Sequence, residues 1–337
     1  MRPIFHPQLV NDRFGDPGLY IEFLFEKRAL LFDLGDLRAL ASRKILRISD
    51  VFVSHAHMDH FVGFDQLLRI CLGREKRLRL YGPPGFIEQV EHKLKAYTWN
   101  LVHNYPADLS LEVTELRPDG TARRSVFHCR QAFRRETDEG FLISGHVLLD
   151  EAAFRVRTVF LDHKIPCLAF ALEEKLHINV WKNRLAEMQL ATGPWLQALK
   201  KAVMSGAPDD TIIQADAVEH GVPHEKQLPL GLLKERILRI VPGQKITYVT
   251  DAVYHEQNAK KIVALAQDSD ILAIETTFLE EDAERAMEKY HLTARQAGML
   301  ARAAHAKKII PFHFSPKYAG EELRLREELH DAYTGNR

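Results

Sequence analysis

The order of the expected strands and helices predicts a protein of the α/β class. Strand-like apolar runs alternate with helical patterns near both ends of the chain, and a series of short β-rich runs lies between them. No linker, low-complexity tract or internal repeat divides the 337 residues. We therefore expect a single domain over residues 1–337, with a helical insertion around 175–235.

The first elements follow from short local patterns. Two strands, Leu19–Phe25 and Ala29–Asp33, flank a charged Glu-Lys-Arg turn, and ISDVFVSH predicts a buried strand. FDQLLRICLG predicts a short helix that stops at Gly73, and LRLYGPPG predicts a strand that runs into a Pro-Gly turn. GFIEQVEHKLKAYTWNLV has apolar residues at helical spacing, which predicts a second helix.

The remaining elements divide into three stretches. Residues 110–175 are rich in strand patterns such as LEVTEL and FRVRTVFLDH. Residues 178–205 predict helix, with Gly193-Pro194 as a break. The last third alternates regularly, because KITYVTD, SDILAIET and KKIIPFHFS predict strands, whereas NAKKIVALAQ and LTARQAGMLARAAH predict helices.

The composition limits the classes of function. The formal net charge is zero with histidines neutral, so no global field draws the chain to nucleic acid or to a membrane, although a local basic patch stays possible. No apolar run is long enough to span a bilayer, and the N-terminus does not resemble a signal peptide. Three widely spaced cysteines argue against a disulfide framework. We expect a cytoplasmic protein without a membrane partner.

Metal-ligating side chains are concentrated in one segment, VFVSHAHMDH. His55, His57, Asp59 and His60 follow directly after a buried strand. Because side chains alternate along extended backbone, His55 and His57 point the same way, and Asp59 and His60 turn toward a second position. Imidazole and carboxylate ligands without cysteine favour zinc, with manganese and iron as alternatives. A surface loop that is histidine-rich by chance is the alternative interpretation.

Further ligands are expected where other apolar strands end. His163 ends RTVFLDH, Asp251 ends KITYVTD, and His313 lies in IIPFHFS. Any of them alone is more often a hydrogen-bonded core residue, but strands that end at one sheet edge would bring them together. The sequence then predicts two ions: His55, His57 and His163 for one, Asp59, His60 and His313 for the other, and Asp251 between them. A hydroxide that bridges the ions would attack an ester near neutral pH, because metal binding lowers the pKa of water.

These residues resemble the metallo-β-lactamase superfamily and, within it, the ribonuclease Z (tRNA 3′-processing endonuclease) family. SHAHMDH matches the histidine motif of the superfamily, and YVTD matches the strand of its bridging aspartate. DILAIETTF and HLTARQAGMLARAAHAKKIIPFHFSPKY are similar to the end of the ribonuclease Z sequences. The resemblance covers most of the chain, from about Asp33 to Tyr318.

The resemblance implies a fold, an activity and further site residues. The fold would be a four-layer αββα sandwich of two mixed β-sheets flanked by helices. The activity would be the cleavage of a phosphodiester, with a precursor tRNA that carries a 3′ trailer as the best-matched substrate, and the family implies a homodimer. Asp59 and His291 are the candidate catalytic residues, with His291 suited to protonate the departing 3′ oxygen. Ser315 and Tyr318 would lie near the phosphate, and Asp33 would hold a ligand histidine.

The chain also departs from the family pattern. TDA stands where the family has G-D-T, NDRFGDPGLY differs from the glycine- and serine-rich opening, and residues 175–206 contain no glycine-rich stalk for a tRNA-gripping arm. A small-molecule phosphodiester or ester hydrolase without tRNA specificity is therefore the alternative function, and an iron redox centre or a metal-bound scaffold is a second one.

Two basic stretches leave the polyanion question open. GREKRLRL and ARRSVFHCRQAFRR carry dense positive charge, and the second interleaves phenylalanines as nucleic-acid surfaces do. A solvated edge strand that is kept soluble by its charge is the alternative.

Overall fold

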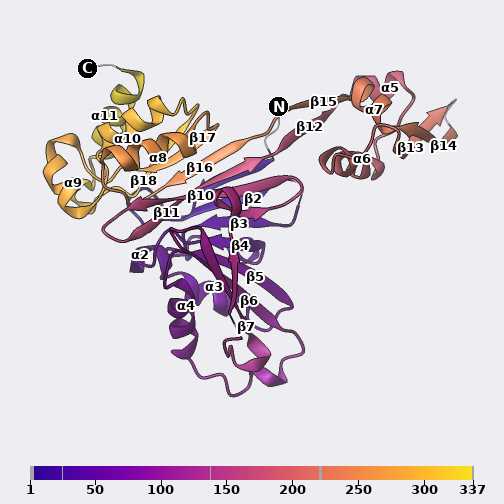
Figure 1. Cartoon of the computed structure of the whole chain (residues 1–337). Coiled ribbons are helices and arrows are strands. Elements are labelled where there is room, and N and C mark those ends of the chain that lie inside the picture. The colour runs from indigo at the N-terminus through magenta and orange to yellow at the C-terminus, as the bar shows by residue number, and fades with distance from the viewer. Residues whose placement is uncertain (1–3, 25, 137, 220–221, 336–337) are drawn as a thin grey trace. The chain divides into compact units, whose positions relative to one another are not determined.

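The computed structural model describes residues 4–24, 26–136, 138–219 and 222–335 (Figure 1). The chain forms two compact units. The first comprises Met1–Leu148, Val156–Leu172 and Lys245–Arg337, and the second comprises Leu149–Arg155 and Glu173–Gln244. The insertion expected around residues 175–235 lies within the second unit. Among the described residues, no helix has the length and apolar character needed to cross a membrane.

The first large sheet has eight strands in sequential order, and its central pairs are parallel. The strands are β1 (Phe5–Leu9), β2 (Leu19–Phe23), β3 (Ala29–Phe32), β4 (Ile48–Phe52), β5 (Lys76–Gly82), β6 (Leu109–Leu116), β7 (Thr121–His128) and β8 (Glu139–Leu142). The connections contain α1 (Ser42–Ile45), α2 (Met58–Phe61), α3 (Phe64–Cys71) and α4 (Phe86–Lys95). Because the pairs at both edges are antiparallel, the sheet is mixed.

The second large sheet has six strands in the order β18-β17-β16-β11-β10-β9. Their bounds are β9 (Val147–Asp150), β10 (Phe154–Asp162), β11 (Pro166–Glu174), β16 (Lys245–Val249), β17 (Ile271–Glu275) and β18 (Ile309–Phe312). The last three are parallel to one another, so their carboxyl ends meet at one edge. Helices α8 (Glu256–Ala266), α9 (Ala283–Lys289), α10 (Ala294–Ala303) and α11 (Glu322–Thr334) accompany them.

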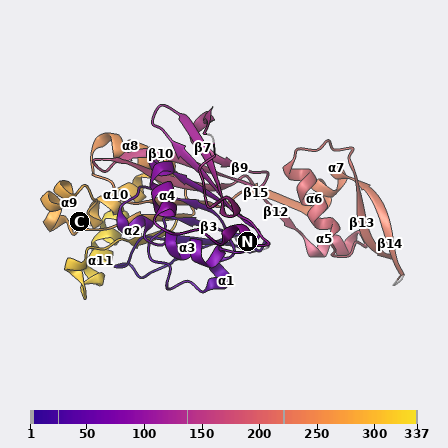
Figure 2. The same cartoon turned by 90° about the horizontal axis from the view of Figure 1, so that it is seen from below.

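The two sheets pack face to face through aromatic side chains. The ring of Phe170 on β11 lies 5.4 Å from that of Phe32 on β3 and 5.7 Å from that of Phe52 on β4. The opposite face of the first sheet buries apolar residues of α3 and α4, and that of the second sheet buries residues of α8, α10 and α11 (Figure 2). The expected four-layer αββα sandwich is confirmed, because burial on both faces of each sheet requires a covering layer on each side.

The second unit has a hydrophobic core of its own. The elements of this unit are β12 (Leu176–Val180), α5 (Lys182–Glu187), α6 (Trp195–Met204), β13 (Ile212–Glu219), β14 (Val222–Pro229), α7 (Leu230–Ile237) and β15 (Leu238–Pro242). Leu199, Leu230 and Leu233 are fully buried there. β12 pairs with β15 and β13 with β14, both antiparallel.

Two expectations about local structure were wrong. The helix expected from residue 178 begins only at Lys182, because Ile178 pairs with Ile240 in the β12–β15 ladder. The helix expected from residue 85 to about 102 ends at Lys95. There the carbonyl of Leu94 accepts from the Trp99 indole at 2.8 Å and from the amide of Tyr97 at 3.4 Å, so this carbonyl is satisfied without a further helical turn.

Candidate metal centre

The loop after β4 carries the histidine-rich segment. His57 is the N-cap of α2, and the carbonyl of His60 accepts from the amide of Leu34 at 2.9 Å. His55 and His60 are fully buried, whereas His57 is exposed. Gly63 lies three residues after His60, and its amide donates to the carbonyl of Leu34 at 2.9 Å. The loop is thus fastened to the segment after β3, which fixes the directions of its four candidate ligands.

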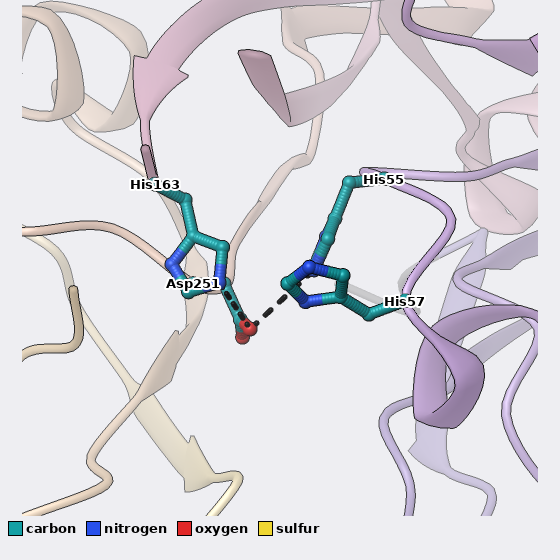
Figure 3. Close-up of side chains that lie close together, drawn as sticks. All are labelled: His55, His57, His163 and Asp251. Atoms are coloured by element: carbon teal, nitrogen blue, oxygen red, sulfur yellow. Dashed lines mark ion pairs between the residues drawn. The ribbon is translucent and has the colours of Figure 1, made fainter. Parts of the chain in front are cut away.

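The other expected ligands converge on this loop. His163 follows β10, Asp251 follows β16, and His313 follows β18. Oδ2 of Asp251 lies 3.4 Å from Nε2 of His163, and Figure 3 shows the Asp251 carboxylate between His163 and the pair His55 and His57. The same oxygen lies 3.6 Å from Nε2 of His55. Residues that are far apart in the sequence therefore meet at one carboxylate.

Seven side chains fall into two groups of donor atoms that lie within 4.8 Å of one another. The first group is His55, His57, His163 and Asp251, and the second is Asp59, His60 and His313. A third group within the same distance, Asp251, Glu275, His291 and His313, overlaps with both. Asp251 stands between the groups, because its Oδ2 lies 3.4 Å from Nε2 of His60 and its Oδ1 lies 3.4 Å from Nδ1 of His313. The first two groups contain the seven residues that the sequence predicts as ligands, whereas the third group was not predicted. The role of all these residues as metal ligands stays a prediction.

The ring nitrogens of the buried histidines show how the groups suit a cation. Nε2 of His55 and Nε2 of His60 are buried without a hydrogen-bond partner. The opposite nitrogens are engaged: Nδ1 of His55 lies 3.0 Å from the hydroxyl oxygen of Ser54, and Nδ1 of His60 lies 2.9 Å from Asp33 Oδ2. Nδ1 of His163 likewise lies 2.7 Å from the carbonyl of Tyr290. Buried polar atoms are rarely left without a partner, so two orphaned nitrogens that face one carboxylate fit a divalent ion.

Electrostatics at the centre favours the same arrangement. Burial and the neighbouring His60 lower the pKa of His55 to about 2, so this imidazole is neutral, as a ligand must be. Burial opposes charge on His60, but the carboxylates of Asp251 and Asp33 outweigh it and raise the pKa of His60 well above the ordinary value. Positive charge is therefore stabilised where His60 faces Asp251, and a divalent cation would supply it.

Asp33 hydrogen-bonds to Ser54 and His60 and so fixes the histidine-rich loop. Its Oδ2 accepts from the hydroxyl groups of Tyr248 at 2.8 Å and Ser54 at 2.9 Å, and its Oδ1 accepts from the amide of Ser54 at 2.6 Å. Together with the bond to His60, the fully buried carboxylate has four donors. The expected contact between Asp33 and a candidate ligand histidine is confirmed.

His291 lies beside the two groups and is paired with a residue that sequence reasoning missed. Its Nδ1 is 2.9 Å from Oε2 of Glu275, and its ring lies 5.1 Å from that of His163 and 5.4 Å from that of His313. Burial alone would lower the pKa of His291, but the charge of Glu275 raises it to about 9. Glu275 ends the apolar strand β17 as Asp251 follows β16, and this position was the available signal.

A cavity of about 350 Å³ opens beside His291, His313 and Asp59. Ser315 lines it, whereas Tyr318 does not. Tyr318 is buried, and its hydroxyl donates to Asp282 and accepts from the amide of Leu279 at 3.3 Å. The structure therefore places Ser315 at the cavity and engages the Tyr318 hydroxyl in contacts within the protein.

Arginines of the expected basic strand are paired with carboxylates. Arg123 lies 3.1 Å from Glu115, Arg124 lies 3.1 Å from Glu112, and Arg135 lies 2.6 Å from Asp138. Their charge is balanced within the protein, which favours the solvated-strand interpretation of ARRSVFHCRQAFRR over a polyanion surface.

The sequence matches a known family model and known relatives over most of its length. The model of the beta-lactamase superfamily domain matches residues 31–136 and 206–314. Ribonuclease Z of Deinococcus radiodurans is 30% identical over 306 residues, which are 90% of this chain and 86% of that protein. The chain belongs to the ribonuclease Z family of the beta-lactamase superfamily. The resemblance drawn from the motifs is confirmed.

Solved structures agree with this family in their fold. Human short-form tRNase Z superposes with a TM-score of 0.52 at 18% identity, over 94% of this chain and 92% of that chain. The metallo-beta-lactamase fold protein YhfI from Bacillus subtilis superposes with a TM-score of 0.54 at 14% identity, over 98% and 94% of the two chains. The ribonuclease Z family member described here thus has the metallo-β-lactamase fold.

Proposed function

We propose that this protein is a metal-dependent endoribonuclease that removes the 3′ trailer from precursor tRNA. The observation that carries the proposal is the convergence of His55, His60 and His163 on Asp251. Membership of the ribonuclease Z family supplies the substrate class. Zinc is the proposed metal, because the donor set is imidazole and carboxylate without cysteine.

The proposed ligands are the seven side chains of the two groups. His55, His57 and His163 would hold one ion, Asp59, His60 and His313 the other, and Asp251 would touch both. When bound, a pair of divalent ions polarises a phosphodiester and activates water. Asp33 keeps His60 in the orientation that leaves Nε2 directed at Asp251. His163 is oriented in the same way by the carbonyl of Tyr290.

His291 is the proposed general acid. It lines the cavity beside His313, and Glu275 both fixes its Nδ1 and stabilises its protonated form. A protonated imidazole at this place can donate to the 3′ oxygen as that oxygen leaves phosphorus. Glu275 is in turn fixed by the amide of Ala252, which donates to Oε1 at 2.6 Å.

The test compares two substrates and four proteins, namely wild type, two variants of the site and one control variant. Wild type is expected to cleave a precursor tRNA with a 3′ trailer and also bis-p-nitrophenyl phosphate. Asp251→Ala is expected to lose both activities together with bound metal, because the substitution removes the carboxylate that both groups share. Inductively coupled plasma mass spectrometry measures the bound metal. His291→Ala is expected to keep its metal and to lose about 10²–10⁴-fold in kcat on the RNA.

His305→Ala is the matched control, because His305 is an exposed histidine outside the cavity. It is expected to behave as wild type. Wild type that hydrolyses only the small ester would contradict the tRNA assignment and favour the small-molecule hydrolase. Full turnover by Asp251→Ala would contradict the metal assignment. Homodimerisation and a cytoplasmic location stay predictions.

A further inference from the structure

One wall of the cavity is formed by cationic and aromatic side chains that the proposed chemistry does not use. Arg285 and Lys289 of α9 line it together with Phe278, and Phe14 from the loop between β1 and β2 contributes to the lining as well. The guanidinium of Arg285 lies 5.9 Å from the centre of the Phe278 ring. Both cations are exposed, so they reach the cavity from the solvent side.

Helix α9 is fastened directly to the candidate metal centre. Tyr290 follows its last residue with a φ of +60°, and the carbonyl of Tyr290 is the partner of His163 Nδ1 at 2.7 Å. The amide of His291 donates to the carbonyl of Ala286 at 2.9 Å, which closes the end of the helix. The positions of Arg285 and Lys289 are therefore set relative to the reacting centre by hydrogen bonds rather than by a free loop.

Nearby acidic side chains have other cationic or hydroxyl partners. Asp282 lies 2.5 Å from Lys317, Glu281 lies 3.0 Å from Arg324, and Glu280 accepts from the hydroxyl of Thr293 at 2.6 Å. Within the described part of the chain, no carboxylate lies within ion-pair distance of Arg285 or Lys289. Glu284 and Glu288 of the same helix line a neighbouring hollow, which Arg285 and Lys289 line as well, but neither glutamate lines this cavity. The carboxylates that line this cavity are those of Asp16 and Asp59.

We propose that Arg285 and Lys289 are positioning residues that bind a phosphate next to the scissile one, with Phe14 and Phe278 against the attached base. The ligand is a nucleotide of the single-stranded segment that flanks the cleaved bond. Guanidinium and ammonium groups bind phosphate, and aromatic faces stack on bases. The volume of the cavity lies within the usual range of ligand pockets, about 300–1,000 Å³. This inference rests on the proposed function.

The test uses Arg285→Ala, Lys289→Ala and the double variant. Each single change is expected to raise KM for precursor tRNA about 3–10-fold and to reduce the slope of log(kcat/KM) against log[salt] by about 0.7, the loss for one contact to single-stranded phosphate. Hydrolysis of bis-p-nitrophenyl phosphate is expected to stay within about twofold, because this ester has no neighbouring phosphate. Arg285→Lys and Lys289→Arg are expected to restore the salt slope, because they preserve the charge.

Arg43→Ala and Lys308→Ala are the charge-matched controls, since both residues are exposed and neither lines the cavity. A double variant whose KM and salt slope equal those of the controls overturns the assignment, and so does an equal loss on the small ester. These outcomes are separate from the failure of the proposed function. In that case wild type itself would leave the precursor tRNA intact.

Discussion

At the scale of single residues, Asp33 links the fold to the candidate metal centre. Its carboxylate lies at the end of β3 and accepts from Tyr248 of β16, which belongs to the other sheet. The same oxygen fixes the ring of His60, whose other nitrogen faces Asp251. One buried carboxylate therefore ties both sheets to one candidate ligand.

Asp33→Asn tests this link. The amide nitrogen of asparagine cannot accept a hydrogen bond, so the variant loses acceptors for His60, Ser54 or Tyr248. We expect the affinity for zinc to fall about 10–100-fold, which is usual when a residue that hydrogen-bonds to a metal ligand is substituted. Competition with a fluorescent chelator measures it. Asp36→Asn is the control, because Asp36 pairs with exposed Arg38. Equal affinities of the two variants would refute the role of Asp33.

At the scale of elements, close backbone contacts place the histidine-rich loop. Gly63 opens α3 directly after the loop, and a Cβ at this position would lie 2.1 Å from the carbonyl oxygen of Gly35 and 2.9 Å from Cγ of Leu37. Gly35 in turn packs against the carbonyl oxygens of Asp59 and Pro17, each 2.6 Å from where its Cβ would be. The segment after β3 and the loop after β4 touch where only glycine fits.

Gly63→Ala is therefore expected to be destabilising. The φ of Gly63 is −70°, so the backbone suits alanine and the expected cost is steric. Overpacking of this kind typically costs about 1–3 kcal/mol. Thermal unfolding measures the loss as a lower Tm. Gly140→Ala, whose Cβ would meet nothing within 4 Å, is the control and is expected to keep the Tm of wild type. Equal Tm values for the two variants would contradict the steric cost, because they would mean that the surrounding loop moves to accommodate the methyl group.

At the scale of the whole molecule, the candidate ligands come from both sheets of the first unit. The loop after β4 belongs to the first sheet, whereas His163, Asp251 and His313 follow strands of the second. A cation that binds all of them is bound only by the folded protein. Metal binding should then stabilise the native state by mass action.

Removal of metal tests that coupling. Protein treated with a chelator is expected to have a lower Tm, and zinc at about 1,000 times its Kd should restore about 4 kcal/mol of stability per site. Calorimetry at several zinc concentrations, together with elemental analysis for two ions per chain, is the measurement. Asp251→Ala is expected to respond weakly. A Tm of wild type that is insensitive to zinc would contradict the two-ion centre.

The sequence predicted the centre better than its surroundings. His163, Asp251 and His313 each follow an apolar run, and this local signal survives in the fold because the strands end at a shared edge. Glu275 ends such a run too, but its role depends on its distance to His291, which no local pattern reports. The ion pair of Arg123 with Glu115 could not be predicted from the sequence either, because the register of the β6–β7 pairing decides which residues face each other.

The elements that sequence reasoning missed have weak or mixed patterns. β14 (Val222–Pro229) alternates exposed with half-buried residues, so its apolar content is too low to mark a strand. α9 is short and carries one buried residue, Ala286. The end of β12 from Ile178 was mistaken for helix because its partner strand β15 begins at Leu238, far along the chain. Such pairings are decided by tertiary contacts and not by propensity.

The loop from His55 to His60 supplies donors to both groups within six residues. Backbone hydrogen bonds to Leu34 already hold this stretch in the folded protein, so both groups of donors are in place before a cation arrives. The conformational entropy of the loop is therefore lost on folding and not on metal binding. Metal uptake should then leave hydrogen exchange of the amides in this loop unchanged.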